Sequence, residues 1–184
     1  MIFGPEHLSI ISFIASAMCG VVGLALFIAP ERCAGQLKAF PRSKTIGMAL
    51  TAISLLWSAT LINQMTLGEL SKYKNLLYVL TPLSFYLIIK YLEELLAARA
   101  FGGLLMLLPT MMIDAARWHP SPSRLVVVTL GYIMVILGIW LVLSPFKFRV
   151  WTNWIMQAPV RRSFTAIAFL MLMVLLAATG ILTA

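Results

Sequence analysis

The sequence predicts an all-α, polytopic helical membrane protein with six membrane segments. Of the 184 residues, 61% are hydrophobic and only 11% are charged, whereas about a quarter of the residues in a soluble domain are charged. The apolar residues gather in long uncharged runs, and none of these alternates as the strands of a membrane barrel do. We therefore expect a single transmembrane helical bundle over residues 1–184, with segments at approximately 8–29, 45–62, 75–92, 100–116, 125–143 and 163–184.

The first segment, 8–29, has 22 residues without a charge, and a helix needs roughly 20 to cross a bilayer. Small residues recur every four positions on two neighbouring faces of this helix: Ser12, Ser16 and Gly20, and Ala15, Cys19 and Gly23. Lipid supplies no hydrophobic force between helices, so close packing across such faces must hold two helices together. The pattern indicates a closely packed partner helix, although small residues are also frequent in membrane helices in general.

Three other segments are also long uncharged runs, of 18 residues at 45–62, 19 at 125–143 and 22 at 163–184. Two basic connections, 30–44 and 144–162, precede the second and the last of the six segments. Both connections combine basic with apolar or aromatic side chains, which is typical of segments that lie in the headgroup layer. Ser43 is placed to cap the helix that follows the first connection.

The two central segments are shorter, because their uncharged parts cover only 15 residues (75–89) and 14 residues (100–113). Each is interrupted by a proline, Pro82 or Pro109. Either flanking residues extend both segments to full spans, or the two form a re-entrant pair that does not cross the membrane. Short segments interrupted by Gly or Pro also point to a membrane binding site.

Six charged residues in and around this central pair are the candidate transport or pairing residues: Lys90, Glu93, Glu94, Arg99, Asp114 and Arg117. Carboxylates at membrane depth are costly and usually functional. The same stretch also reads as a short surface helix between two spans, with Lys90 and Glu94 four residues apart. Asp114 and Arg117 are three residues apart and can pair at the end of the fourth segment.

No other chemistry stands out. A metal site built from His7, His119 and a carboxylate lacks any supporting spacing such as HxxxH or HxxE. The chain has no phosphate-binding loop, dinucleotide fingerprint or GxSxG motif. We therefore expect no catalytic residues, no metal and no cofactor, and these absences favour a protein that is not an enzyme.

The net charge of +8 does not indicate a nucleic-acid partner, because the basic residues lie between apolar runs, where they suit anionic lipid headgroups. Ten of the 14 Lys and Arg fall in 30–44, 90–99 and 144–162, which six spans place on one side of the membrane. The positive-inside bias then puts both termini outside the cytoplasm. The general make-up is that of small bacterial membrane proteins, so we expect a bacterial inner membrane.

The sequence therefore favours a structural or accessory subunit that is not an enzyme and that assembles with itself or with a larger membrane complex. This hypothesis rests on the small-residue faces of 8–29 and on the lack of catalytic groups. The alternative is a small transporter or channel with its site between the third and fourth segments. Its expected partners are the lipid bilayer and other membrane subunits, as for the first hypothesis.

Overall fold

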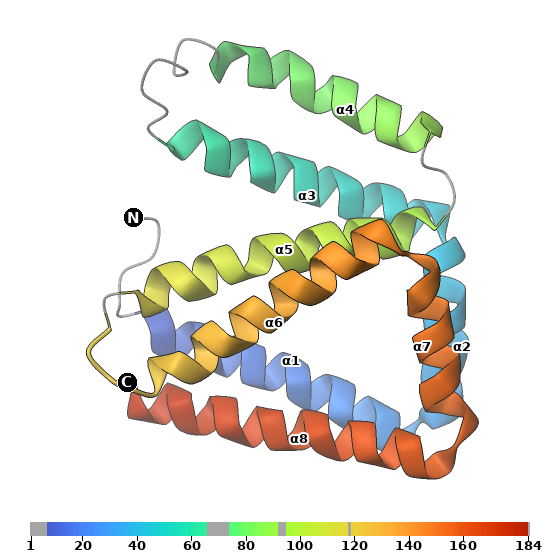
Figure 1. Cartoon of the computed structure of the whole chain (residues 1–184), viewed down its shortest axis with the longest axis vertical. Coiled ribbons are helices and arrows are strands. Elements are labelled where there is room, and N and C mark those ends of the chain that lie inside the picture. The colour runs from blue at the N-terminus through green and yellow to red at the C-terminus, as the bar shows by residue number, and fades with distance from the viewer. Residues whose placement is uncertain (1–6, 66–73, 92–94, 118, 184) are drawn as a thin grey trace.

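The computed structural model describes residues 7–65, 74–91, 95–117 and 119–183, which form helices and short turns and no strand. In chain order the elements are α1 (Leu8–Ile28), α2 (Pro30–Ala39), the 3-10 turn η2 (Phe40–Arg42), α3 (Lys44–Gln64), α4 (Leu77–Tyr91), α5 (Leu96–Ala116), α6 (Arg124–Leu143), α7 (Phe146–Gln157) and α8 (Pro159–Leu182). The all-α class is confirmed (Figure 1).

Five of these helices, α1, α3, α5, α6 and α8, are long enough and apolar enough to cross a membrane. They contain 20 to 24 residues, which is about 30–36 Å of helix against a hydrocarbon core of about 30 Å. The helix α4, at the sixth segment predicted from the sequence (75–92), is not among these five, because it has only 15 residues, or about 22 Å. A 3-10 turn at 74–76 precedes it and adds about 6 Å. Flanking residues thus extend α4 almost to the length of a span.

The first and last membrane helices, α1 and α8, pack together in antiparallel orientation (Figure 1). The predicted small-residue face forms the contact, since Ser12, Ser16, Gly20 and Gly23 are all buried. The Ser16 hydroxyl donates a hydrogen bond to the Met173 carbonyl oxygen at 2.8 Å, from one helix to the other. The prediction of a closely packed partner is confirmed, and the partner is a helix of the same chain.

The second tight pair is α5 with α6, which cross in Figure 1. A Cβ atom added to Gly102 would lie 2.8 Å from the Gly138 carbonyl oxygen, and one added to Gly138 would lie 2.7 Å from the Gly102 carbonyl oxygen. The two backbones therefore meet at these glycines. Close backbone approach of this kind is how membrane helices gain packing energy.

Helices α3 and α4 form an outer layer beside this assembly (Figure 1). The contact of α3 with α5 is close, because a Cβ atom on Gly47 would lie 2.9 Å from the backbone nitrogen of Ala97. Helix α4 packs only loosely on α3 and has no buried residue. It contains no glycine, so its backbone cannot approach a neighbour as closely as the other spans do.

The core is small and lies at one end of the bundle, where α1 and α6 begin and α5 and α8 end. Its buried residues come from these four helices: Leu8, Met112, Ala115, Ala116, Val127 and Leu176. Toward the opposite end the pairs α1/α8 and α5/α6 diverge, and α2 and α7 run across that end (Figure 1). The two predicted headgroup-layer connections are thus short helices that lie side by side.

Two observations bear on the alternatives left open for the central pair predicted at 75–92 and 100–116. First, α5 begins at Leu96 and has 21 residues, so it is a full-length span; the count of uncharged residues stopped at Arg99, which lies in its first turn. Second, α4 and α5 are not neighbours, because α3 lies between them (Figure 1). The arms of a re-entrant hairpin pack on each other, and these two helices do not.

Candidate functional site

The six candidate transport or pairing residues do not form one site. Lys90 lies in the last turn of α4, and Arg99 lies in the first turn of α5 at the same end of the bundle. Asp114 and Arg117 lie at the other end of α5, and the 15 steps from Arg99 to Asp114 correspond to about 22 Å of helix. Glu93 and Glu94 lie outside the residues that the structure describes.

Lys90 has an aromatic rather than an acidic environment among the described residues. Its ammonium nitrogen lies 5.6 Å from the ring centroid of Tyr86 and 5.7 Å from that of Tyr91, within the range of cation–π attraction. At the opposite end of the same helix, Lys74 Nζ donates to the Asn63 carbonyl oxygen at 2.6 Å. Each end of the α4 segment thus carries a lysine, which is typical of a membrane helix anchored at both interfaces.

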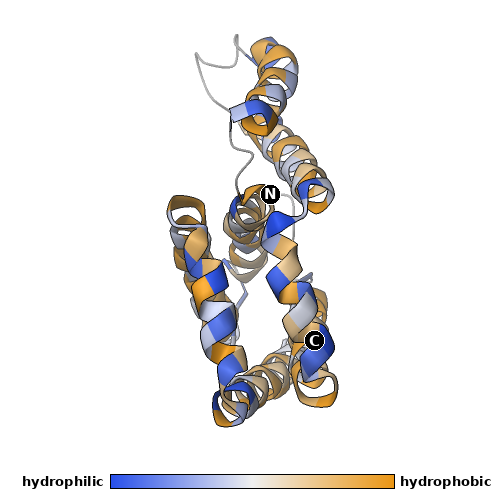
Figure 2. Ribbon diagram, turned by 90° about the vertical axis from the view of Figure 1, so that its right-hand side faces the viewer, coloured by the Kyte–Doolittle hydropathy of each residue, from blue (hydrophilic) through white to orange (hydrophobic). Residues whose placement is uncertain are grey.

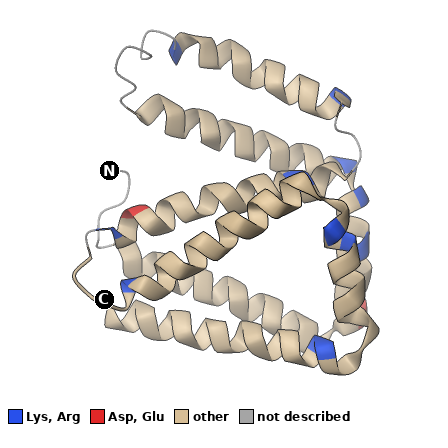
Figure 3. Ribbon diagram, viewed as in Figure 1, with Lys and Arg blue, Asp and Glu red and all other residues tan. Residues whose placement is uncertain are grey.

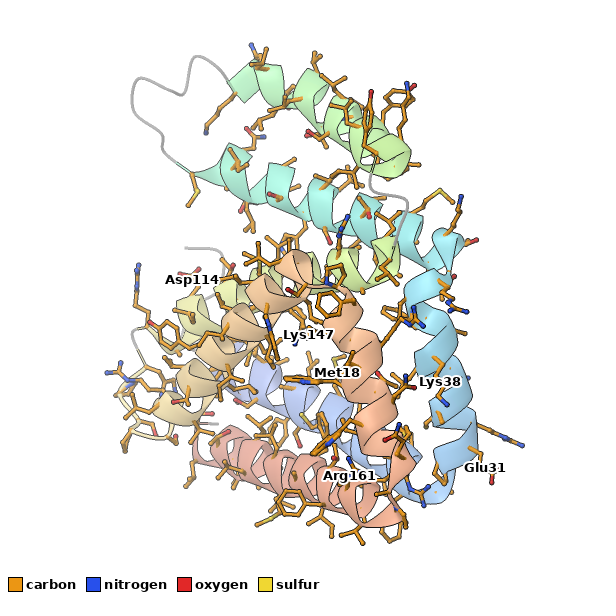
Figure 4. All side chains as sticks on the ribbon, turned by 45° about the vertical axis from the view of Figure 1, so that its right-hand side comes forward. Met18, Glu31, Lys38, Asp114, Lys147 and Arg161 are labelled. Atoms are coloured by element: carbon orange, nitrogen blue, oxygen red, sulfur yellow. The ribbon has the colours of Figure 1, made fainter. Side chains whose placement is uncertain are left out.

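Asp114 lies at the far end of α5 (Figure 4), where it is half-buried, while Arg117 is exposed. The Arg117 carbonyl oxygen accepts a hydrogen bond of 3.0 Å from Nη1 of Arg124, at the start of α6. Two guanidinium groups and one carboxylate are therefore carried by adjacent helix ends. The direct pairing of Asp114 with Arg117 stays a prediction.

A groove with a volume of about 480 Å³ lies between α3 and α5. Its lining residues are Ile53, Leu56, Trp57, Thr60, Leu61 and Gln64 on α3, and Thr110, Met111 and Asp114 on α5. Its polar residues, Thr60, Gln64, Thr110 and Asp114, all lie toward the C-terminal ends of the two helices. The groove is therefore apolar along most of its length and polar at one end.

Only Asp114 of this lining was a candidate from the sequence. Gln64 was missed because the second span was predicted to end at residue 62, whereas α3 continues to Gln64. The spacing of Thr60 and Gln64, one helical turn apart, was the available signal. It did not reveal which other helix would complete the groove.

The histidines lie apart from this groove. His119 Nδ1 accepts a hydrogen bond from the Ser121 backbone N–H at 3.2 Å, so the imidazole helps to form the turn before α6. Within the described ranges no three side chains of His, Cys, Asp or Glu are grouped as metal ligands.

The end of the bundle that carries α2 and α7 is strongly basic (Figure 3). Ten of the 13 described Lys and Arg lie there: Arg32, Lys38, Arg42, Lys44, Lys90, Arg99, Lys147, Arg149, Arg161 and Arg162. Glu31 is the single described acidic residue at this end. Hydrophilic and hydrophobic residues intermingle along both short helices (Figure 2), as expected for segments at a membrane surface.

Aromatic contacts join this basic layer to the spans. Phe40, Phe101 and Phe148 form a three-ring cluster with centroids 5.5 to 6.4 Å apart, and it connects η2, α5 and α7. Trp140 of α6 and Trp151 of α7 also pack edge to face, with their ring centroids 4.5 Å apart. The layer is therefore fixed to the bundle by ring packing.

These observations define three surfaces: the groove, the basic layer and the outer face of α4. Among the described side chains, the lining of the groove includes one carboxylate, that of Asp114, and no histidine. Comparison of the chain with protein-family models, with curated proteins and with solved structures found no match.

Proposed function

We propose that the protein is a structural or accessory membrane subunit that is not an enzyme, and that it assembles with itself or with a larger membrane complex through α4. The observation that carries the proposal is that α4 alone among the six membrane segments buries no residue. A helix that packs weakly within its own chain has a face available for another. The small-residue face of α1, from which the sequence predicts assembly, is occupied by α8.

The outer face of α4 is apolar and continuous. Val79, Leu83 and Tyr86, spaced as successive turns of one helical face, are 63%, 48% and 58% exposed. Tyrosine supplies a large contact area at little cost in conformational entropy, and it is frequent in interfaces. We therefore assign the contact with a second subunit to this face.

The test is the mass of the particle extracted from its native membrane in a mild detergent. We expect a mass above that of one 20.4 kDa chain, from a second copy or from a co-purifying subunit. The triple variant Val79→Ala, Leu83→Ala and Tyr86→Ala is expected to lose the additional mass.

The matched control changes Ile167, Met171 and Val174 of α8 to alanine, because they have the same spacing and are 49%, 70% and 61% exposed. This variant should keep the wild-type mass. A monomeric wild-type particle with no co-purifying chain, or equal loss of mass from both triple variants, would contradict the proposal.

The alternative function, a small transporter or channel, was assigned a site between the third and fourth segments. Helix α3 lies between these segments, and the four candidates that the structure describes, Lys90, Arg99, Asp114 and Arg117, are divided between the two ends of the bundle. No described Asp, Glu, Lys, Arg or His side chain lies midway along any of the six membrane segments, where such residues mark transport pathways. The accessory function is therefore the one that the geometry supports better.

We also propose that the basic layer faces the cytoplasm of a bacterial inner membrane, so that both termini lie outside the cytoplasm. The positive-inside bias supports this orientation, because α1 begins and α8 ends at the less basic end (Figure 3). The test is labelling by an impermeant thiol reagent in a Cys19→Ser, Cys33→Ser background. Gly35→Cys on α2 should label only from inside, and Met65→Cys, at a position that is 61% exposed, only from outside.

The reverse pattern would overturn the orientation. Ala97, in the predicted connection 90–99, is unsuitable for this experiment because it is fully buried against α3.

A further inference from the structure

We propose that the groove between α3 and α5 binds one phospholipid with an ethanolamine headgroup, its acyl chain along the apolar wall and its headgroup at Asp114. This inference concerns a different surface from the outer face of α4 and goes beyond the assembly proposed above. It rests on the length of the groove, on the position of its polar end and on the charges there.

The length of the groove matches half a bilayer. Its lining on α3 runs from Ile53 to Gln64, and these 11 steps correspond to about 16 Å. The hydrocarbon core is about 30 Å thick, so the groove covers the depth of one leaflet. Its volume of about 480 Å³ is within the range of about 300–1,000 Å³ that is usual for small-molecule sites.

The polar end of the groove lies where a lipid headgroup would be. Gln64 is the last residue of α3, and Asp114 is in the last turn of α5. Figure 4 shows Asp114 at the opposite end of the bundle from Lys38 and Lys147 of the basic layer. The apolar residues Ile53 and Leu56 lie deeper along α3, on the side of the membrane midplane. Headgroup and acyl chain can therefore both be accommodated in one orientation.

The charges at this end complement a zwitterionic headgroup. The Asp114 carboxylate can accept a charge-assisted hydrogen bond from an ammonium group. Arg124 Nη1 donates to the Arg117 carbonyl oxygen at 3.0 Å, so both arginines lie at this end of the bundle, beside the lining and not in it. Their guanidinium groups can bind the phosphate of a headgroup held at Asp114. Phosphatidylglycerol offers the phosphate without the ammonium group, and phosphatidylcholine offers a cation without an N–H donor. Asp114 should therefore discriminate between the three headgroups.

The experiment is native mass spectrometry of the full chain, exchanged into micelles that contain phosphatidylethanolamine, phosphatidylglycerol or phosphatidylcholine with identical acyl chains. We expect one phosphatidylethanolamine per chain to be retained, about tenfold more tightly than either other lipid. Asp114→Asn should remove this preference, because it removes one charge-assisted hydrogen bond. Glu31→Gln, which changes the other described carboxylate, should leave the preference intact.

A second pair of variants tests the groove itself. Ile53→Trp fills it, while Ile46→Trp makes the same change on the same side of α3, two turns away and outside the lining. The two side chains have similar exposure, 52% and 44%. We expect Ile53→Trp to lose the bound lipid and Ile46→Trp to retain it. Leu56→Trp, at a groove position that is 63% exposed, repeats the test should Ile53→Trp fail to fold.

Three results would overturn the proposal. Equal retention of the three lipids would remove the role of Asp114. Retention of phosphatidylethanolamine by both groove-filling variants would place the lipid elsewhere. A dimeric wild-type particle that Ile53→Trp converts to a lipid-free monomer would show that a second copy of the chain occupies the groove.

Discussion

Replacing Gly138 with alanine should destabilise the bundle, because the added methyl group meets backbone atoms of α5. Its Cβ would lie 2.7 Å from the Gly102 carbonyl oxygen and 3.1 Å from the Met106 backbone nitrogen. Backbone cannot rotate away as a side chain can, so the two helices must separate. Overpacking of this kind costs about 1–3 kcal/mol, while alanine regains up to about 1 kcal/mol of helix propensity over glycine. We expect the free energy of unfolding to fall by about 1–2 kcal/mol in total.

Gly131→Ala is the matched control, two turns earlier on the same helix and also facing α5. Its Cβ would be 3.5 Å from the nearest atoms, on Ile113 and Pro109, which is ordinary van der Waals contact. This variant should be neutral or up to about 1 kcal/mol more stable. The gain in helix propensity is common to both variants. The difference between their free energies of unfolding, about 1–3 kcal/mol, therefore isolates the steric cost.

The assay is reversible unfolding in mixed micelles with increasing sodium dodecyl sulfate, followed by circular dichroism. If Gly138→Ala unfolds at the same detergent fraction as Gly131→Ala, then α5 and α6 do not meet at these glycines and the reasoning fails.

Two further predictions use the same unfolding assay. Ser16→Ala removes the interhelical hydrogen bond to Met173 and should lower the free energy of unfolding by about 0.6 kcal/mol. Ser12→Ala should be nearly neutral, because Ser12 bonds only to its own helix, at the Leu8 carbonyl oxygen. Equal effects of the two substitutions would argue against the interhelical bond. Phe148→Leu opens the three-ring cluster and should cost about 1 kcal/mol, whereas Phe146→Leu, at a position that is 53% exposed, should cost little. A larger effect at Phe146 would show that the cluster does not fix the basic layer to the spans.

The positions of the spans could be predicted from the sequence because long uncharged runs have few alternatives in a membrane. The runs at 8–29 and 125–143 agree with α1 and α6 to within one residue at each end. The predicted start of a span differs most from the observed start where a basic residue lies inside the first turn of the helix. Arg99 and the pair Arg161 and Arg162 are within α5 and α8, because long basic side chains can extend from a helix end to the headgroups.

The arrangement of the helices could not be predicted in the same way. The small residues of α1 indicated close packing correctly but could not identify α8 as the partner, since small faces also occur on other helices. Likewise, the groove forms only because α3 and α5 are adjacent. No periodic pattern in the sequence of either helix indicates that they pack together. The charged residues of the sequence indicated a candidate site at 90–99, whereas the polar end of the groove lies at the other end of α5.

The pairing of α1 with α8 has a consequence for biosynthesis. The hydrogen bond from Ser16 to Met173 joins residues 157 positions apart, so it cannot form until nearly the whole chain has left the ribosome. During that interval α1, with two serines and two glycines on the face that later contacts α8, has to remain in the lipid or at the insertion machinery without its partner. Helices α3, α5 and α6, by contrast, can assemble as soon as each is inserted. The chain should therefore become resistant to proteolysis in two steps. Helices α3, α5 and α6 are protected in the first step, and α1 is protected in the second, when α8 packs against it.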